Sequence, residues 1–287
     1  MLLKALGAPP GRKCHLLIKV NVNVSAMNPV PPKLSLQGIF KSFVTKGESL
    51  QVLNGVDIEV AQGGFLSVIG PSGCGKTTVF NIIAGLIAPD QGRISVDGVA
   101  VNDLRGRVGY MMQKDLLFPW RTVLENVLLG LELKKIPLLE ARETAREYLH
   151  TYGLSGFENA YPRTLSGGMR QRVALIRTLI SNPDILLLDE PFSALDYQTR
   201  LYLEGVLIEA VDTFKKTVIL VTHDIDEAVA LSRNVTVLSG RPTTVKANYS
   251  IDIQERTPIG ARSDPRFSEY FHALCAELDI QTRRKAA

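Results

Sequence analysis

The chain has little cysteine and no long apolar run. Its three cysteines, Cys14, Cys74 and Cys275, lie far apart and lack the spacing of a zinc site or a disulfide framework, so we expect a reducing compartment. The longest apolar runs, such as Ile185 to Leu188 and Val218 to Val221, are far shorter than the roughly 20 residues that a membrane-spanning helix needs. We therefore expect any association with a membrane to come through partner proteins.

The chain also lacks a strong charge of either sign and an excess of aromatic residues. Charged residues make up 22% and aromatic residues 7%, ordinary values that exclude disordered and collagen-like classes. The formal net charge is only +4, and we interpret the basic tail Arg283-Arg284-Lys285 as a solvated end, so nucleic acid is not an expected partner. At 287 residues the chain is long enough for one large or two modest domains.

The first 33 residues differ from the remainder. They are rich in proline and show no helical or strand periodicity, so we expect a disordered arm over residues 1–33. Met27 lies shortly before the first expected strand, and a true start at Met27 is a hypothesis that native peptides from residues 1–26 would contradict.

From Leu34 onward, expected strands and helices alternate. Asp97-Gly98 is typical of a hairpin turn, and apolar residues at spacings of three and four predict helices between about 123 and 181. This order indicates an α/β core with a helical insertion. We expect strands at 34–40, 51–60, 65–69, 93–96, 99–101, 185–188, 218–221 and 243–253, and helices at 76–84 and about 265–278.

A glycine-rich loop follows the strand expected at 65–69. Residues 70–77 match the phosphate-binding pattern G-x-x-x-x-G-K-[ST], in which glycines and a helix N-terminus turn backbone amides toward the anion. We expect Lys76 to reach the β- and γ-phosphates and Thr77 to bind Mg²⁺, with Cys74 a small filler. The alternative is a glycine-rich turn that binds no nucleotide. The nucleotide-binding residues expected here are Gly70, Pro71, Ser72, Gly73, Cys74, Gly75, Lys76, Thr77 and Thr78.

Polar residues follow two apolar strands of the expected sheet. Asp189 and Glu190 come directly after Ile185 to Leu188, and His223 follows Val218 to Val221. Ligands of open α/β sheets bind at this strand edge, so we expect Asp189 to hold Mg²⁺ through water. Glu190 would polarise the attacking water, and His223 would contact the γ-phosphate. The alternatives are that Glu190 is the solvated end of a strand and that His223 is structural. The expected catalytic residues are Glu190, His223 and Lys76.

A second glycine-rich segment, the signature, opens the helix expected to end at Ser181. Ser166 is a plausible cap, and the two glycines that follow leave the first-turn amides accessible to an anion. The chain thus has two phosphate-binding helix starts but one carboxylate pair. The mismatch is resolved if two copies meet head to tail, each signature covering the nucleotide of the other. The signature residues expected to face the partner's nucleotide are Leu165, Ser166, Gly167, Gly168 and Met169.

In their order, the loop, a glutamine segment, the signature, the Asp-Glu pair and the histidine resemble an ABC transporter ATPase over roughly residues 34–238. The resemblance implies a P-loop NTPase core with a mixed or parallel central sheet and an N-terminal antiparallel β subdomain. It places the ABC ATPase domain at 34–254, a helical subdomain at about 115–182, and a C-terminal helical extension at 255–287. It also implies ATP and Mg²⁺, a homodimer, and two integral-membrane permease subunits at the cytoplasmic face of the inner membrane.

The resemblance assigns further residues that spacing alone does not. Phe43 matches the aromatic residue that stacks on adenine, and Gln113 matches the glutamine that touches Mg²⁺ and senses the membrane subunit. Methionine stands at position 169, where the family usually has glutamine. The implied ligands of Mg²⁺ are Thr77, Gln113 and Asp189. The segment that matches the loop crossing the dimer interface is Ser193, Ala194, Leu195 and Asp196.

Within the family, the segment from Leu116 to Val123 is similar to importers of nitrate, sulfonates and taurine, which also need an extracytoplasmic substrate-binding protein. Phe118 and Trp120 would fill a groove shared with a membrane-subunit helix, or they merely close the local core. The transported molecule does not touch this subunit, so the sequence does not select it.

The alternative to transport is an ABC ATPase that acts on DNA or ribosomes. Chromosome-type members need a long coiled-coil insertion, but only 113 positions separate Lys76 from Asp189, with no sustained heptads. Translation-type members carry two ATPase units, and this chain has one copy of each motif. These observations favour transport.

Overall fold

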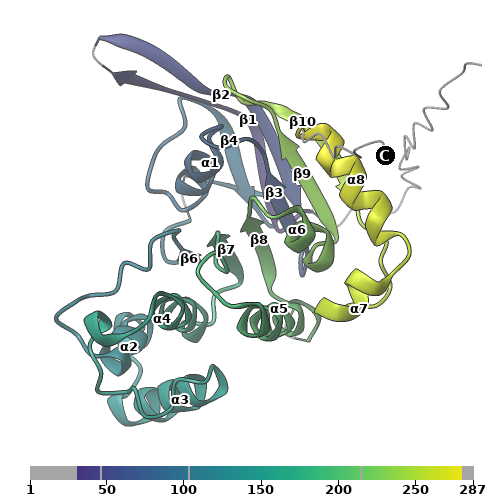
Figure 1. Ribbon diagram of the computed structural model, residues 1–287. Coiled ribbons are helices and arrows are strands. Elements are labelled where there is room, and N and C mark those ends of the chain that lie inside the picture. The colour runs from purple at the N-terminus through teal and green to yellow at the C-terminus, as the bar shows by residue number, and fades with distance from the viewer. Residues whose placement is uncertain (1–30, 46, 103, 214, 280–287) are drawn as a thin grey trace, which may run out of the picture. The chain divides into compact units, whose positions relative to one another are not determined.

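The computed structural model describes residues 31–45, 47–102, 104–213 and 215–279, which form two β-sheets and a set of helices (Figure 1). Most of the arm expected at 1–33, the candidate start at Met27 and the basic tail lie outside the described residues. Of that arm, Lys33 is described: it is largely buried and forms an ion pair with Asp97 at 3.0 Å. Within the described residues, no helix combines the length and apolar character needed to cross a bilayer.

The central sheet has six strands in the order β10-β9-β3-β8-β7-β6. All neighbouring pairs are parallel except the edge pair of β9 and β10, so the sheet is mixed as expected. The central strands β3, β8 and β7 are buried along their whole length. Its strands are β3 (Phe65–Ile69), β6 (Val108–Met111), β7 (Ile185–Asp189), β8 (Thr217–Val221), β9 (Asn234–Leu238) and β10 (Val245–Ser250).

The two faces of this sheet belong to two hydrophobic cores. Along β7, Leu186 and Leu188 pack in one cluster, together with α4, α5 and α6. Ile185 and Leu187 pack in the other, together with α1 and the second sheet. A strand covered on both faces needs apolar residues at every position, which explains the continuous runs in the sequence. The prediction of central parallel strands is confirmed. The helices named here are α1 (Lys76–Ile83), α4 (Gly167–Ile180), α5 (Tyr197–Asp212) and α6 (Ile225–Leu231).

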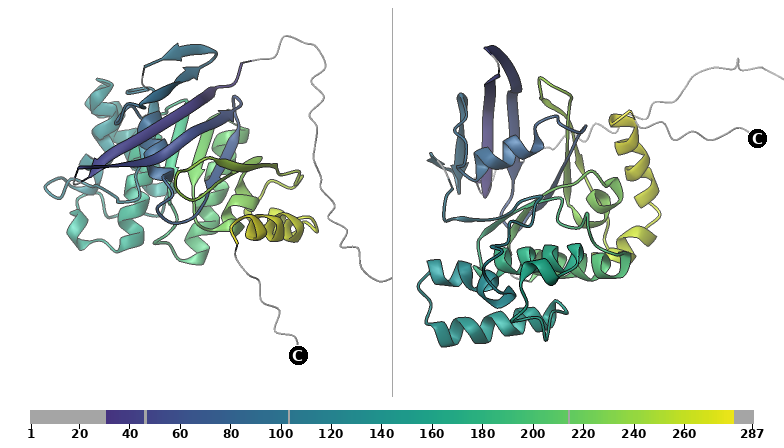
Figure 2. Two further views of the ribbon diagram at one scale, coloured as in Figure 1. Left: turned by 90° about the horizontal axis from the view of Figure 1, so that it is seen from above. Right: turned by 60° about the vertical axis from the view of Figure 1, so that its left-hand side comes forward.

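The second sheet is antiparallel, with strand order β2-β1-β4-β5. Asp97 and Gly98 have φ values of 51° and 77°, the positive values that an Asp-Gly hairpin turn requires, and this predicted turn is confirmed. The sheet lies over α1, as the two views of Figure 2 show. Its strands are β1 (Leu34–Thr45), β2 (Glu48–Val60), β4 (Gln91–Val96) and β5 (Val99–Val101).

Three helices gather beside the central sheet in the predicted helical region (Figure 1). Thr122 begins the first with a capping box, in which its hydroxyl accepts from the Glu125 amide while the Glu125 carboxylate accepts from the Thr122 amide. Ala141, Ala145 and Leu149 form the buried stripe of the second. The boundaries expected for this subdomain remain a prediction. The elements are α2 (Val123–Leu133), α3 (Leu138–Thr151), a 3₁₀ turn (Pro162–Thr164) and α4.

The C-terminal region adds two helices that pack beside α6. The expected helix at 265–278 is observed as α8 (Phe267–Glu277), where Leu274 and Cys275 are buried. A second helix, α7 (Pro258–Ser263), precedes it and contacts both α5 and α6. The sequence did not predict α7, or the strands β6 and β9, because each is short and weakly periodic.

Candidate nucleotide site

The phosphate loop connects β3 to α1 and is shaped by two glycines. Gly73 and Gly75 have φ values of 71° and 123°, which a residue with a side chain rarely adopts. A Cβ on Gly75 would also lie 2.9 Å from Cγ1 of Val52. The loop can therefore take this path, with its backbone toward a ligand, because glycine occupies both positions.

The side chain of Lys76 forms hydrogen bonds inside the phosphate loop. Its ammonium donates to the carbonyl oxygens of Gly70 and Pro71 at 2.7 and 3.0 Å, and the residue is largely buried. Cys74 is buried beneath it in the second core, as a small filler would be. The cation is thus held at the centre of the loop, within reach of an anion that the loop encloses.

Thr77 and Asp189 are brought together across the site. The Thr77 hydroxyl donates to Oδ2 of Asp189 at 3.0 Å, although 112 positions separate the two residues. Burial raises the pKa of Asp189, and the hydrogen bond from Thr77 partly opposes that shift. A hydroxyl and a buried carboxylate that meet at the start of α1 are hard oxygen donors of the kind that Mg²⁺ prefers.

Glu190 lies at the end of β7 with both carboxylate oxygens engaged. The Gln113 side-chain amide donates to Oε2 at 3.0 Å, and Nδ1 of His223 lies 3.2 Å from Oε1. The backbone of Glu190 has φ of 51°, a strained value for a residue with a side chain, and its amide donates to the Val221 carbonyl at 2.8 Å. The sequence-predicted residues Gln113, Glu190 and His223 therefore meet at one sheet edge.

The signature forms the start of α4. The Ser166 hydroxyl caps this helix by accepting from the Met169 amide at 3.2 Å, and both Ser166 and Gly167 are exposed. A Cβ on Gly168 would lie 3.1 Å from the carbonyl oxygen of Ala194. The signature thus packs against the predicted interface loop, in which Asp196 caps α5, and turns its first residues to solvent.

Gln171 connects these segments, and sequence reasoning gave it no role. Its side-chain amide donates to the Glu190 carbonyl at 3.0 Å, and its carbonyl oxygen accepts from the Ala194 amide at 3.0 Å. The available signal was its position four residues after Gly167, on the same face of the helix. Gln171 fixes the signature helix to both the catalytic strand and the interface loop.

Two arginines of α4 hold the segment that follows Gln113. Arg170 forms an ion pair with Asp115 at 3.0 Å, and Arg177 donates to the carbonyls of Asp115 and Leu116 at 2.7 and 2.8 Å. Sequence reasoning missed both arginines, because their partners lie more than 50 positions away. The glutamine segment and the signature helix therefore form one connected unit.

This arrangement agrees with a known family. The family model described as "ABC transporter" matches residues 53–193, a range that holds the phosphate loop, the signature and the Asp-Glu pair. The aliphatic sulfonates import ATP-binding protein SsuB of Bacillus cereus is 43% identical over 73% of this chain and 82% of its own length. The chain belongs to the ABC transporter ATP-binding family. It is accordingly an ATPase, and the sequence resemblance is confirmed.

Other relatives and solved structures of the family support the assignment. The taurine import ATP-binding protein TauB of Rhizobium johnstonii is 41% identical over 81% of this chain and 90% of its own length. The nitrate import ATP-binding protein NrtD of Synechocystis is 40% identical over 85% of this chain and 94% of its own length. The dimeric structure of MJ0796, a bacterial ABC transporter cassette, is 34% identical, has a TM-score of 0.71, and covers 76% of this chain and 98% of its own. The relatives favour transport over a role on DNA or ribosomes, and the fold is that of an ABC ATPase.

The adenine-stacking role of Phe43 remains a prediction in this ABC ATPase. Phe43 lies on β1 opposite Leu50, near the turn of the long hairpin with β2. Nζ of Lys41 lies 5.6 Å from the centre of its half-buried ring, and the same ammonium pairs with Asp90 at 2.7 Å. The ring is therefore held in a fixed place beside a cation.

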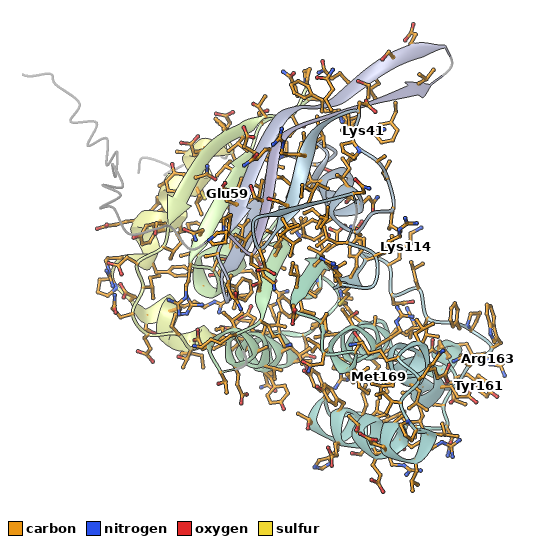
Figure 3. The ribbon with its side chains drawn as sticks, turned by 180° about the vertical axis from the view of Figure 1, so that it is seen from behind. Lys41, Glu59, Lys114, Tyr161, Arg163 and Met169 are labelled. Atoms are coloured by element: carbon orange, nitrogen blue, oxygen red, sulfur yellow. The ribbon has the colours of Figure 1, made fainter. Side chains whose placement is uncertain are left out.

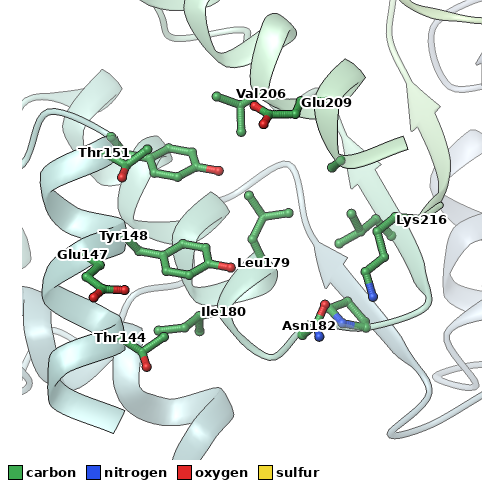
Figure 4. A pocket seen from close by; sticks show the side chains of 14 residues that line it. Thr144, Glu147, Tyr148, Thr151, Leu179, Ile180, Asn182, Val206, Glu209 and Lys216 are labelled. Atoms are coloured by element: carbon green, nitrogen blue, oxygen red, sulfur yellow. The ribbon is translucent and has the colours of Figure 1, made fainter. Parts of the chain in front are cut away.

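The described residues line two hollows, of which one lies beside the signature. One, of about 470 Å³, lies between the Gln113 segment, the start of α4 and the interface loop at Ser193. The other, of about 530 Å³, lies among α3, α4 and α5, where Tyr148 and Lys216 point into it (Figure 4). The phosphate loop lines neither hollow.

Proposed function

We propose that this chain energises an ABC importer of small anions or zwitterions of the nitrate, sulfonate and taurine class. In this proposal two copies form a homodimer on two permease subunits at the cytoplasmic face of the inner membrane, and an extracytoplasmic binding protein delivers the cargo. The names of relatives that match most of the chain support the cargo class and the permease partners. The dimeric cassette structure supports the pairing.

One observation carries the proposal: the chain holds two different halves of a nucleotide site. The first half comprises the phosphate loop, the Thr77–Asp189 contact, and Glu190 between Gln113 and His223. The second is the exposed, capped start of α4 at Ser166. Head-to-tail pairing of two copies would join unlike halves twice, which a two-fold axis permits.

In the proposed mechanism, Lys76 turns from the carbonyls of its own loop to the β- and γ-phosphates of ATP, a stronger, charge-assisted partner. Thr77, Asp189 and Gln113 would hold Mg²⁺, which neutralises charge that develops on the phosphates. The signature of the partner would donate its first-turn amides to the γ-phosphate.

Glu190 then accepts a proton from the attacking water. The water oxygen forms a bond to the γ-phosphorus while the bond from that phosphorus to the oxygen of ADP breaks, and ADP and phosphate result. The strained backbone of Glu190 and its contacts with Gln113 and His223 hold the carboxylate in place before water arrives. Gln171 connects the Glu190 carbonyl to the signature helix, so closure of the dimer would change the position of Glu190, the general base.

The segment after Gln113 presents an aromatic surface for the permease. Phe118 and Trp120 stack with ring centres 5.1 Å apart, and Trp120 is 70% exposed, so this pair does not close a local core. The first two amides of α2, those of Val123 and Leu124, donate to the backbone carbonyls of Ala160 and Glu158. Tyr161, labelled in Figure 3, follows Ala160 in the chain and is 42% exposed. A permease helix placed here would act on Gln113 through Arg170 and Arg177.

The replacement of Glu190 by Gln tests the composite site. The amide cannot accept the water proton, so hydrolysis should fall by about 100-fold or more while the loop still binds ATP. With saturating MgATP, Glu190→Gln should run as a dimer in size-exclusion chromatography, and Glu190→Gln/Lys76→Ala should run as a monomer. A Glu190→Gln protein that stays monomeric contradicts the composite site.

The same variant tests the cargo class in cells. Cells that lack the chain should lose uptake of labelled nitrate, taurine or an alkanesulfonate, and the wild-type chain should restore that uptake. Glu190→Gln should not restore it, because closure without hydrolysis cannot be repeated. Normal uptake of all three compounds in cells without the chain contradicts the proposed class.

A further inference from the structure

The C-terminal helix α7 connects to the loop that carries His223 through buried charges. The guanidinium of Arg262 donates to both carboxylate oxygens of Glu204 on α5, at 2.8 and 3.1 Å. Its Nε donates to Asp226 on α6. The Glu204 side chain is fully buried and that of Arg262 is 15% exposed, so this is an interior contact and not a surface ion pair.

Arg200 lies one helical turn before Glu204 on α5, and its positive charge opposes the rise in the pKa of Glu204. Its Nη1 lies 3.1 Å from Oδ2 of Asp224 and 3.4 Å from Oε1 of Glu227. The second oxygen of Glu227 accepts from the Thr222 hydroxyl at 2.7 Å, and Glu227 is almost fully buried. Arg200 also follows the interface loop directly, since α5 begins after Asp196.

These contacts fix the residues on both sides of His223. Thr222 donates to Glu227, and the Asp224 amide donates to the Thr222 hydroxyl at 3.0 Å. Asp224 also caps α6 by accepting from the amides of Asp226 and Glu227. The His223 side chain itself is 68% exposed, so its approach to Glu190 depends on the backbone at 222–224.

We propose that Arg262 of the C-terminal extension is a positioning residue for ATP hydrolysis, which acts through Glu204, Arg200 and Glu227 on the loop that holds His223 against Glu190. The inference rests on the proposed role of His223. The network contains four carboxylates and two guanidiniums: Glu204, Asp224, Asp226, Glu227, Arg200 and Arg262.

The charge balance of the network explains why each arginine matters. Burial raises the pKa of Glu227 to about 7 and also raises the pKa of Glu204, whereas the guanidiniums of Arg200 and Arg262 oppose these shifts. The positive charges of the arginines therefore favour the ionised form of both buried carboxylates. Loss of Arg262 leaves Glu204 buried without its bidentate partner, which favours a rearrangement of α5 against α6.

The test compares two arginines of the extension in the full-length chain. Arg262→Gln should lower kcat for ATP hydrolysis about ten-fold, with the KM for ATP within about two-fold, since a small misplacement of a catalytic group acts on the chemical step. Arg266→Gln is the matched control. Arg266 forms ion pairs with Asp252 and Asp264, outside the network, and its variant should keep both parameters. An unchanged kcat in Arg262→Gln overturns the proposal.

A double-mutant cycle separates positioning from loss of stability. In a His223→Ala background, Arg262→Gln should lower kcat no further, because the side chain that Arg262 is proposed to position is already absent. A full ten-fold loss there overturns the proposal. If Arg262→Gln does not fold, Arg262→Gln/Glu204→Gln removes both charges and takes its place. Glu227→Gln, which keeps an acceptor for the Thr222 hydroxyl, should retain more activity than Glu227→Ala, and equal losses overturn the route.

The cycle also separates this inference from the proposed function. If His223→Ala hydrolyses ATP at the wild-type rate, the role of His223 fails and the positioning role fails with it. If His223→Ala is impaired while Arg262→Gln is normal, the proposed function stands and the positioning role alone is overturned.

Discussion

The two anion-binding helix starts of this chain, those of α1 and α4, use the same backbone physics but differ in what surrounds them. At α1, Lys76 is buried among loop carbonyls and Thr77 meets Asp189, so the surroundings of the start come from its own chain. At α4, Ser166 caps the helix and Gly167 is exposed. In the proposed composite site, the first start holds the nucleotide of its own chain, and the second completes the site of another copy.

The α4 start differs from the α1 start in a second way. One turn into α4, Gln171 is buried and connects the Glu190 carbonyl to the Ala194 amide. We propose that a contact made at the exposed start of α4 is transmitted through Gln171 to the strand that ends at Glu190.

The largest effect is expected at the α1 start. Lys76→Ala removes the cation that the loop encloses, and hydrolysis should fall by about 100-fold or more because transition-state charge loses a fixed partner. Lys41→Ala is the control, since it removes another lysine near the site that pairs with Asp90. The rate of ATP hydrolysis by the two purified variants measures this difference. Wild-type turnover in Lys76→Ala contradicts the assignment of the loop.

A smaller effect is expected at the α4 start. Ser166→Ala removes a cap and a phosphate contact, and hydrolysis should fall about ten-fold, as for one charge-assisted hydrogen bond. Thr122→Ala is matched to it, because Thr122 caps α2 in the same way. Both variants should lose about 1 kcal/mol of stability in thermal unfolding, but Thr122→Ala should hydrolyse ATP normally.

Mixed dimers test whether the α4 start acts on the other copy. A mixture of Lys76→Ala and Ser166→Ala chains forms dimers in which one site has an intact loop and an intact signature. Hydrolysis should therefore exceed that of either variant alone. If the signature served its own chain, each copy in the mixture would still carry one defect, and activity would not rise.

The sequence predicted the α1 start more completely than its surroundings. Thr77 was assigned from the phosphate-loop pattern. Asp189, Glu190 and His223 were assigned because they stand where apolar strands end, and parallel strands bring their carboxyl ends to one edge. The Asp97-Gly98 turn was predicted from its own residues, whereas the antiparallel sheet was implied by the family resemblance.

What the sequence did not predict depends on contacts between distant segments. Gln171 meets Glu190, and Arg262 meets Glu204, by the packing of whole helices against one another. The spacing of a glutamine or an arginine in the sequence does not identify its partner, since most such residues on helices are solvated. The short edge strand β6 and the helix α7 were missed because few residues in each face a core.

The smallest effect is expected on the ratio of ATP to GTP affinity, which depends on how the base of the nucleotide is held on the α1 side of the comparison. If Phe43 stacks on adenine, Phe43→Ala should weaken ATP binding by ~1–3 kcal/mol, and Phe43→Tyr should restore it by keeping the π-face. Because every base has such a face, GTP should lose the same amount, and the ratio of ATP to GTP affinity should change by less than about two-fold. Titration of both nucleotides against wild type and the two variants measures this ratio. A large preference of the wild type for ATP that persists in Phe43→Ala would show that another residue recognises the edge of the base. Base specificity would then not depend on β1.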